Sequence, residues 1–358
     1  MNTTLLLNGK SIHYDDLRSG SAIGETEFEN STLNFCRQWL NEQSSFSIKT
    51  SGSTGPPKII PFTREQMLAS AKQTIAFFNL RPDDTVLVCL NTAYIAGLMM
   101  LVRGFTAGSK IIAIEPSGNP LVDITETISF MAVVPLQLNN IIEEPATLLK
   151  QEAIRNTIVG GAPVSFSLQQ KISKLKASVW ATFGMTETLT HFGVRQLSPL
   201  EEKLFTVLPM TSIRGDERGC LIVKSDVTQN EELMTNDLVE IIDDNHFIWK
   251  GRIDNVINSG GVKFQIEDLE AKTAILFSEL NLPNNFFIAK EKDTVTGEKI
   301  CLIIEAIEEL SEIENVNFAN YYDEYGSPKK VAYLQRFVYT PTGKIDRRAS
   351  IHLIDLLA

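Results

Sequence analysis

Short apolar runs alternate with helix-like stretches between residues 84 and 184, and this alternation constrains the fold more than any other feature of the sequence. The stretches between the runs have apolar residues at helical spacing, as in Ile95–Ala107 and Leu136–Ile142. Strands that alternate with helices form a mostly parallel sheet with helices on its faces, so we expect an α/β protein. The predicted strands are Thr85–Leu90, Lys110–Ile114, Phe130–Val134, Thr157–Val159 and Ser178–Phe183.

The pattern changes after residue 204. Short strand-like runs separated by turn residues continue to about residue 250 and predict an antiparallel sheet or a distorted barrel. A helix (Ile266–Phe277), two strands (Phe286–Lys290 and Lys299–Glu305) and a basic loop then predict a small α+β unit. We therefore expect a large N-terminal domain (residues 1–251) and a small, mobile C-terminal domain (residues 252–358).

Composition excludes several classes of function. Lys and Arg number 33 against 44 Asp and Glu, a net charge of −11, which argues against a nucleic-acid partner. The four cysteines are far apart and form no CxxC pair, so neither a zinc site nor a disulfide framework is expected. The longest apolar run, near Ile95–Val102, is too short to span a bilayer, and residues 1–7 lack the basic start of a secretory signal. These features favour a soluble, cytoplasmic protein.

The strongest local motif is a Gly-, Ser- and Thr-rich segment that ends in a lysine. Its glycines allow backbone N–H groups to turn toward phosphate oxygens, and its hydroxyls and lysine add donors and charge. The spacing differs from that of a Walker A loop, because the GxxxxGK[ST] frame is absent. We predict that the phosphate ligands come from Thr50, Ser51, Gly52, Ser53, Thr54, Gly55 and Lys58.

Four further segments carry groups suited to a nucleotide. Ala181–Thr188 follows a predicted strand and offers an aromatic ring, Phe183, and a carboxylate, Glu187, that could hold Mg²⁺. Asp237 could accept hydrogen bonds from a ribose diol. Residues 251–263 combine a cation, a candidate hinge and a Gly-Gly pair, and residues 341–347 place Lys344 on a Gly-containing loop. Taken singly, each of these segments could equally be an ordinary turn, cap or solvated tail.

In this order and at these separations, the five segments together resemble the acyl-adenylate-forming superfamily, which includes acyl-CoA synthetases, peptide-synthetase adenylation domains and luciferases. The resemblance covers about residues 48–348. Gly160–Ser165 also looks like the Gly-Gly-Ala-Pro turn that lies beside the nucleotide in this family.

The resemblance implies a role for each matching residue. ATP or AMP would be bound by the phosphate segment together with Gly161, Ala162, Thr182, Phe183, Gly184, Thr186, Asp237 and Arg252. Lys344, Glu187 and Thr54 would be catalytic, with Glu187 as the Mg²⁺ ligand. Asp254 would be the hinge, and Gly260, Gly261 and Lys263 would form the thioesterification loop. Arg103, Gly184 and His191 would contact the acid.

The same resemblance implies an enzyme that makes an acyl-AMP from ATP and a carboxylic acid with Mg²⁺, and then transfers the acyl group to a thiol such as coenzyme A. Phe183 stands where the family usually has Tyr, and Asn236 where Gly is usual. Relatives carry a long stretch before the phosphate segment, which here begins at Thr50, so we expect most of an N-terminal subdomain to be absent from this sequence. A second copy of the chain or another protein could cover the surface that this leaves.

Arg103 lies among apolar residues, where a guanidinium is costly to bury unless it is paired. Within the superfamily, this chain resembles the o-succinylbenzoate–CoA ligases of menaquinone synthesis in carrying Arg at this position. The substrate of those ligases has a second carboxylate. Arg103 could instead pair with a structural acid. Another acyl- or aryl-CoA ligase, an adenylation domain that loads a carrier protein, and a nucleotide-binding module without catalysis remain the alternatives.

Overall fold

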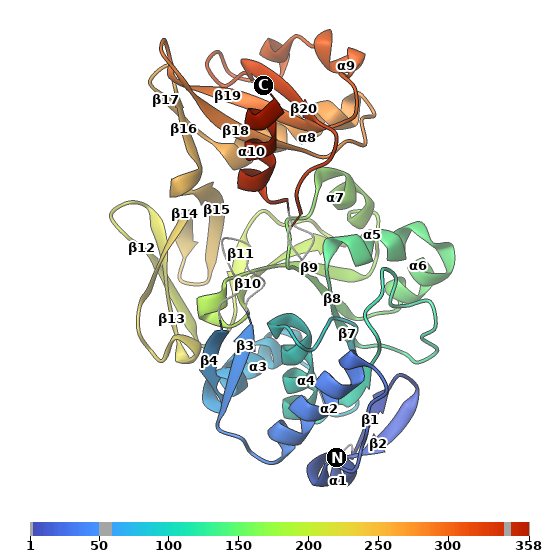
Figure 1. Cartoon of the computed structure of the whole chain (residues 1–358). Helices are drawn as coiled ribbons and strands as arrows, with labels where there is room; N and C mark the ends of the chain where they lie inside the picture. The colour runs from blue at the N-terminus through green and yellow to red at the C-terminus, as the bar shows by residue number, and fades with distance from the viewer. Residues whose placement is uncertain (1–2, 50–58, 340–344, 358) are drawn as a thin grey trace.

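A computed structural model describes residues 3–49, 59–339 and 345–357, and one large mixed sheet is its main feature (Figure 1). The strands of this sheet are β1 (Thr4–Leu7), β2 (Lys10–His13), β5 (Thr85–Val88), β6 (Lys110–Ala113), β7 (Phe130–Val133), β8 (Asn156–Val159), β9 (Ser178–Gly184), β10 (His191–Ser198), β11 (Phe205–Val207), β12 (Thr211–Gly215), β13 (Cys220–Ser225), β14 (Leu233–Asp243) and β15 (His246–Arg252). Their order is β12-β13-β14-β15-β11-β10-β9-β8-β7-β5-β6-β1-β2. The α/β class expected from the sequence is confirmed.

The middle of the sheet is parallel from β1 through β6, β5, β7 and β8 to β9. All four residues of β7 are buried, as expected for a strand covered on both faces. On β5, Val86 and Val88 point into one core and Leu87 into the other. All five predicted strands are present, each ending within two residues of its expected limits. The hairpin of β1 and β2 was not predicted.

Helices cover both faces of the parallel strands. One core includes side chains of the first four helices, and the other includes side chains of the fifth and seventh. The helices are α1 (Tyr14–Ser19), α2 (Glu27–Leu40), α3 (Arg64–Phe78), α4 (Ile95–Ala107), α5 (Pro135–Glu143), α6 (Pro145–Glu152) and α7 (Phe166–Ile172). The start of α3 is fixed by a capping box, in which Thr63 and Gln66 exchange side-chain to backbone hydrogen bonds. The predicted helix at Ile95–Ala107 coincides with α4.

A separate two-stranded sheet flanks the phosphate segment. Its strands, β3 (Ser45–Lys49) and β4 (Ile59–Thr63), are antiparallel, with Lys49 opposite Ile59. Residues 50–58 therefore connect two neighbouring strand ends.

Strands β10 to β15 are antiparallel to their neighbours, as the sequence indicates. They do not form a sheet of their own, because β10 pairs directly with β9 and so joins the two halves into one continuous sheet. Residue shifts in the β9–β10 and β14–β15 registers mark bulges that bend this half. The short 3₁₀ helices η1 (Thr186–Thr188) and η2 (Asp226–Thr228) lie in its connections.

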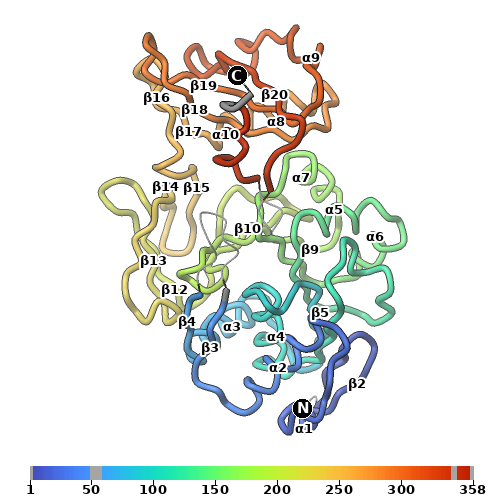
Figure 2. Tube along the Cα trace, in the orientation of Figure 1, coloured from blue at the N-terminus to red at the C-terminus, as the bar shows by residue number. Residues whose placement is uncertain are grey.

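The C-terminal residues form a second sheet with its own cores. Figure 2 shows their trace grouped at one end of the molecule, around the C-terminus. The strand order of this sheet is β17-β16-β19-β18, with β20 paired to β19. The elements are η3 (Ile253–Asn255), β16 (Val256–Ser259), β17 (Val262–Gln265), α8 (Ile266–Glu279), β18 (Phe286–Asp293), β19 (Gly297–Glu305), α9 (Ser311–Glu314), η4 (Phe318–Asn320), β20 (Lys330–Leu334) and α10 (Arg347–Leu357). The change of sheet falls between β15 and β16, and we keep the division into domains at 251/252 as a proposal.

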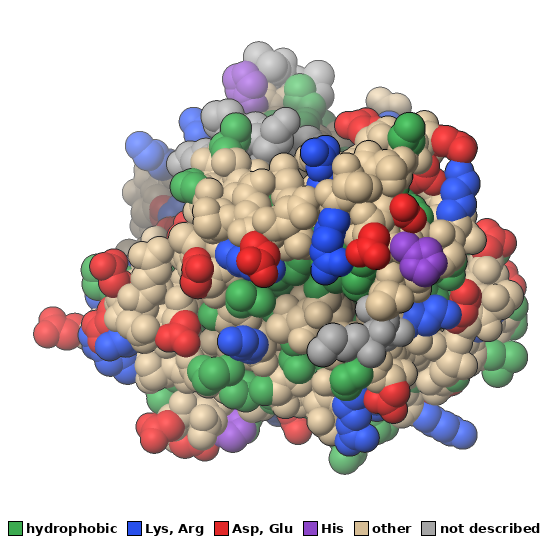
Figure 3. All heavy atoms as spheres, turned by 90° about the horizontal axis from the view of Figure 1, so that it is seen from below, with side chains coloured by type: hydrophobic (Ala, Val, Ile, Leu, Met, Phe, Trp, Pro, Cys, Tyr) green, Lys and Arg blue, Asp and Glu red, His purple; other side chains and the backbone are tan. Residues whose placement is uncertain are grey.

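Charges of both signs are interspersed over the face opposite the C-terminal sheet, so the net negative charge is not gathered there (Figure 3). Within the described ranges, no helix combines the length and the apolar character needed to cross a membrane.

Candidate active site

Two of the predicted groups lie outside the described residues. They are the phosphate segment (Thr50, Ser51, Gly52, Ser53, Thr54, Gly55 and Lys58) and Lys344. Their roles remain predictions from the sequence.

The ends of β8 and β9 bring two predicted nucleotide segments together. These strands are parallel neighbours, so Gly160, Gly161 and Ala162 after β8 lie next to Thr182 near the end of β9. The Thr182 hydroxyl donates to the Val159 carbonyl at 3.2 Å, and a Cβ on Gly160 would lie 2.2 Å from Thr182 Oγ1. Only glycine allows this close approach. The carboxyl ends of neighbouring parallel strands are the usual ligand site of such sheets.

Phe183 belongs to a cluster of aromatic rings from the antiparallel half. Its ring centroid is 5.5 Å from that of Phe192, 5.2 Å from Phe205 and 5.3 Å from Phe247. The Phe183 side chain is only half-buried, so part of it is open to a ligand. The other rings hold it in place, which is what a stacking platform for a purine base requires.

Glu187 is exposed on η1, next to Thr186, directly after β9. The described residues contain no group of three His, Cys, Asp or Glu side chains that could hold a metal ion. Mg²⁺ in nucleotide sites is usually bound by one or two carboxylates together with the phosphates of the substrate. A single exposed carboxylate at the end of a central strand fits that kind of site.

The backbone between Glu187 and His191 is strained. Leu189 has φ +64° and ψ −57°, and the Thr190 N–H donates to the Thr188 carbonyl at 2.7 Å. This is the rare form of the γ-turn, and the side chain of Leu189 is buried. Strain of this kind is often found at functional sites. The turn directs Thr190 and His191 toward helices α3 and α4.

Arg103, on α4, is the most unusual side chain in this region. It is 2% exposed, and it donates from Nε to Thr74 Oγ1 and from Nη2 to Thr190 Oγ1, both at 3.2 Å. Thr190 Oγ1 also lies 2.6 Å from Ser70 Oγ. Among the described residues, Arg103 forms no ion pair, so its buried charge meets only neutral acceptors, the hydroxyls of Thr74 and Thr190 and the sulfur of Met100. Burial lowers the pKa of Arg103 from 12.5 to about 10.

His191 completes a cluster of polar side chains around Arg103. We call it the Arg103 cluster and define it as Ser70, Thr74, Arg103, Thr190 and His191. The imidazole is 7% exposed, and its Nε2 lies 3.4 Å from Thr74 Oγ1. Burial, with a smaller effect of the Arg103 charge, lowers the pKa of His191 well below 6.5. His191 is therefore neutral at pH 7, and Arg103 is the charged group of the Arg103 cluster.

Gly184 lies between the Arg103 cluster and the predicted nucleotide segments. This residue is paired with His191 across β9 and β10, and a Cβ on it would lie 2.4 Å from the Thr190 carbonyl oxygen. The predicted acid contacts Arg103, Gly184 and His191 are thus brought together beside Thr182 and Phe183.

The predicted ribose ligands meet where β14 pairs with β15. Asp237 is opposite Arg252, and its carboxylate is 7% exposed. Trp249 Nε1 donates to Asp237 Oδ1 at 3.0 Å. Burial raises the pKa of Asp237, and the bond from Trp249 partly opposes that rise. Arg252 makes a two-point contact with Asp254 at 2.9 and 2.8 Å, and its Nη1 lies 3.9 Å from Asp237 Oδ2.

The predicted thioesterification loop is the turn of the β16–β17 hairpin. Gly260 and Gly261 are its two central residues, with φ +62° and +81°, which favour glycine at both positions. Lys263 is exposed on β17. The turn belongs to the C-terminal sheet and not to the sheet that carries the nucleotide segments.

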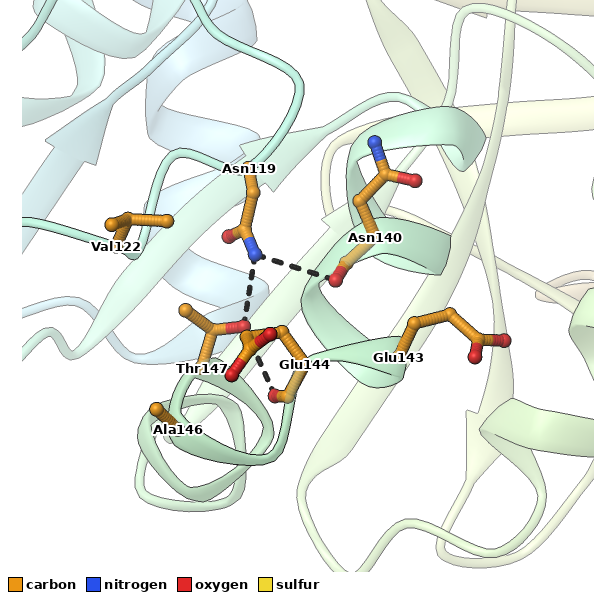
Figure 4. A pocket seen from close by; sticks show the side chains of 7 residues that line it. All are labelled: Asn119, Val122, Asn140, Glu143, Glu144, Ala146 and Thr147. Atoms are coloured by element: carbon orange, nitrogen blue, oxygen red, sulfur yellow. Dashed lines mark hydrogen bonds between the residues drawn. The ribbon is translucent and has the colours of Figure 1, made fainter.

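A surface hollow of about 480 Å³ between α5, α6 and the chain before them is a different place (Figure 4). Its polar groups bond to one another, as where Asn119 Nδ2 donates to Thr147 Oγ1 at 3.0 Å and to the Asn140 carbonyl. No predicted site residue is among those that line it: Asn119, Val122, Asn140, Glu143, Glu144, Ala146 and Thr147.

Sequence reasoning missed four residues that surround the predicted ones. Thr74 and Thr190 accept hydrogen bonds from Arg103, Ser70 is hydrogen-bonded to Thr190, and Trp249 donates to Asp237. Ser70 and Thr74 stand four apart on α3, a helical spacing that would have placed two hydroxyls on one face. Nothing in the sequence marked that face as the one opposite Arg103.

Comparison with known proteins agrees with these features. The family model described as AMP-binding enzyme matches residues 11–212. A solved structure of an acyl-CoA synthetase (AMP-forming)/AMP-acid ligase II-like protein from Dyadobacter fermentans is 38% identical, covers 94% of this chain and 97% of its own, and gives a TM-score of 0.64. The 2-succinylbenzoate–CoA ligase of Staphylococcus epidermidis is 25% identical over 337 residues, which are 86% of this chain and 70% of that protein.

One further structure shares the fold. O-succinylbenzoate coenzyme A synthetase from Bacillus subtilis, solved in complex with ATP and magnesium ion, has a TM-score of 0.70 at 19% identity, over 85% of this chain and 69% of its own.

Proposed function

Because the chain belongs to the AMP-binding enzyme family and is a ligase of the acyl-CoA synthetase type, we propose that the acid it activates is 2-succinylbenzoate. The product would be 2-succinylbenzoyl-CoA, an intermediate of menaquinone (vitamin K2) biosynthesis. ATP and coenzyme A are the other reactants, and Mg²⁺ is the metal that this activity needs. The name of the Staphylococcus epidermidis relative supports this choice of acid.

The buried, unpaired charge of Arg103 is the observation that carries the proposal. A buried guanidinium is destabilising unless an anion compensates it, and here the described residues supply only hydroxyl and sulfur acceptors. A substrate with a second carboxylate would supply that anion. An acid with one carboxylate would present only the group that is activated, so Arg103 would stay unpaired.

In the proposed first step, the acid carboxylate attacks the α-phosphorus of ATP, acyl-AMP forms and pyrophosphate leaves. Phe183 would stack on the adenine, while Asp237 accepts hydrogen bonds from the ribose and Arg252 stays close to it. Lys344 and the phosphate segment would stabilise the negative charge that develops on the phosphates. Glu187 would hold Mg²⁺ together with the phosphates, and the metal would supply further charge neutralisation.

In the proposed second step, the thiol loses its proton to solvent and its sulfur attacks the acyl carbonyl. The C–S bond forms, the C–O bond to the phosphate breaks and AMP leaves. The small domain would turn about Asp254, so that Lys344 withdraws and the turn of Gly260 and Gly261 approaches the acyl-AMP. Lys263 would follow on the same hairpin.

The test is acid-dependent exchange of labelled pyrophosphate into ATP, with 2-succinylbenzoate compared with 4-oxo-4-phenylbutanoate, benzoate and acetate. We expect 2-succinylbenzoate to support the fastest exchange and 4-oxo-4-phenylbutanoate, which lacks the ring carboxylate, to be weaker by about 10-fold or more, the size of a lost charged hydrogen bond. Acyl transfer is then measured with free coenzyme A and with a carrier protein. Equal exchange with 2-succinylbenzoate and 4-oxo-4-phenylbutanoate would contradict the proposed substrate, and transfer to a carrier protein alone would contradict the proposed acceptor.

A further inference from the structure

The turn of the β16–β17 hairpin is covered by an aromatic ring from a distant part of the chain. A Cβ added to Gly260 would lie 2.6, 3.0 and 3.1 Å from Cδ1, Cε1 and Cγ of Tyr325. Three ring atoms at such distances mean that the ring rests on the backbone of Gly260. Glycine is needed here both for its positive φ and for the space that the ring occupies.

The segment that carries Tyr325 is anchored to α8. The Tyr322 hydroxyl lies 2.7 Å from Thr273 Oγ1 inside the core, and Lys272 Nζ lies 2.7 Å from Asp323 Oδ2. The Gly326 N–H donates to the Asp323 carbonyl at 2.9 Å and closes a tight turn. These bonds fix the chain on both sides of Tyr325.

A second contact of the same kind joins the two segments. A Cβ on Gly326 would lie 2.9 Å from Cε1 of Phe264, which is on β17 of the hairpin. Each segment thus places a ring on a glycine of the other: Tyr325 on Gly260, and Phe264 on Gly326. Contacts at two points resist both sliding and twisting of the hairpin relative to α8.

The two glycines of the turn differ in their surroundings. The Gly260 N–H donates to the Thr296 carbonyl at 3.0 Å, so Gly260 is held from the backbone as well as by Tyr325. A Cβ on Gly261 would meet nothing within 4 Å. The turn therefore has one fixed residue and one open residue, which suits an element that must approach a ligand closely without losing its shape.

We infer that Tyr325 is a positioning residue for the thioester-forming step, because its ring sets the geometry of the Gly260-Gly261 turn. The inference rests on the proposed function, in which this turn enters the site for the second half-reaction. Tyr325 acts through Gly260 and need not touch the substrate. Its hydroxyl plays no part in the contact, so Tyr325→Phe keeps the function and Tyr325→Ala loses it.

The experiment separates the two half-reactions in the full chain. Acid-dependent pyrophosphate exchange measures the first, and transfer from preformed acyl-AMP to coenzyme A measures the second. We expect Tyr325→Ala to leave exchange within about 2-fold and to slow transfer by about 10- to 100-fold, mainly in kcat, the effect of a misplaced group near the reacting atoms. Tyr325→Phe should restore transfer. Glu324→Ala, which removes the neighbouring exposed side chain, is the matched control and should behave as wild type.

Amide hydrogen exchange supplies a readout that does not depend on activity. We expect the amides of residues 256–265 to exchange faster in Tyr325→Ala than in wild type, and those of β5 and β7 to be unchanged. Unchanged amide hydrogen exchange in the hairpin of Tyr325→Ala, or normal acyl transfer by this variant, would overturn the role of Tyr325 but not the proposed function. Absence of pyrophosphate exchange with every acid in the wild-type protein would overturn the proposed function itself.

Discussion

Replacing Arg103 with Leu should make the ligand-free protein no less stable while it weakens the enzyme. In the folded state Arg103 is 2% exposed and has no acidic partner among the described residues. Burial lowers its pKa from 12.5 to about 10, and a displacement of that size corresponds to about 3 kcal/mol. Burial disfavours the charged form of Arg103. The resulting loss of folding free energy is therefore fully present at pH 7 and would vanish only above the pKa of Arg103 in the unfolded chain.

The magnitude of the stability effect follows from two opposing terms. Arg103→Leu removes the cost of the buried charge, but it also removes the bonds to Thr74 and Thr190. Each threonine keeps another partner, since Thr190 Oγ1 contacts Ser70 and Thr74 Oγ1 donates to the Ser70 carbonyl. We therefore expect the free energy of unfolding to stay the same or rise by up to about 3 kcal/mol, as measured by urea denaturation without ligand.

The effect on catalysis should be opposite. Loss of a hydrogen bond to a charged group costs about 1.5–3 kcal/mol, so kcat/KM for 2-succinylbenzoate should fall by about 10- to 150-fold, with the KM for ATP nearly unchanged. With 4-oxo-4-phenylbutanoate the same substitution should cost much less. Lys cannot reproduce the two-point contact of a guanidinium with a carboxylate, so Arg103→Lys should not restore the rate.

Arg155 provides the matched control. It makes a two-point contact with the buried carboxylate of Asp84, so Arg155→Leu should lower stability by stranding a buried charge. If Arg103→Leu is destabilised like Arg155→Leu, or if it impairs both acids equally, Arg103 is a structural residue and the reason for choosing this acid is removed.

Three other predictions concern the remaining parts of the site. Lys344→Ala should slow acyl-AMP formation by about 100-fold or more and spare transfer from supplied acyl-AMP, and equal loss in both half-reactions would contradict its role. Asp254→Pro fixes φ at the proposed hinge, so acyl transfer should fall more than adenylation, and an unchanged overall rate would show that the hinge lies elsewhere. Trp249→Phe removes a bond that lowers the pKa of Asp237. That pKa should rise further, so the acid-side fall of kcat/KM for ATP should move to higher pH, and an unmoved profile would mean that Asp237 does not bind the ribose.

Local patterns in the sequence were sufficient for most of the fold. Strands β5, β6, β7 and β8 each contain a buried run of three or four residues because helices cover both their faces, and such runs are visible without knowing the partner strand. Strand β1 was missed because its position depends on a distant segment: Leu5 is paired with Ile111. The antiparallel half could be predicted because its turns are local, whereas its junction to β9 depends on the β9–β10 register, which the sequence does not show.

The site divides in the same way. Gly160, Thr182 and Gly184 could be named from motifs because strand ends bring them together by a general rule of parallel sheets. The surroundings of Arg103 could not, since Thr74 is 29 positions before it and Thr190 is 87 after it. Trp249 was overlooked because an indole in a strand is usually a packing residue, and its donor role depends on the register that places Asp237 opposite Arg252.

The pairing of β1 with β6 has a consequence for how the chain folds during synthesis. Leu5 of β1 pairs with Ile111 of β6, so β1 is synthesised 106 residues before the strand with which it pairs. During that interval β1 and β2 can pair only with each other, and an isolated two-stranded hairpin is at best marginally stable in water. Closure of so long a loop comes late in folding, so this edge of the sheet should be the last to become protected. Until β6 is made, the edge of β1 that β6 will cover is open to a strand of a neighbouring chain, so we expect slower translation through residues 14–113 to lower the yield of soluble protein.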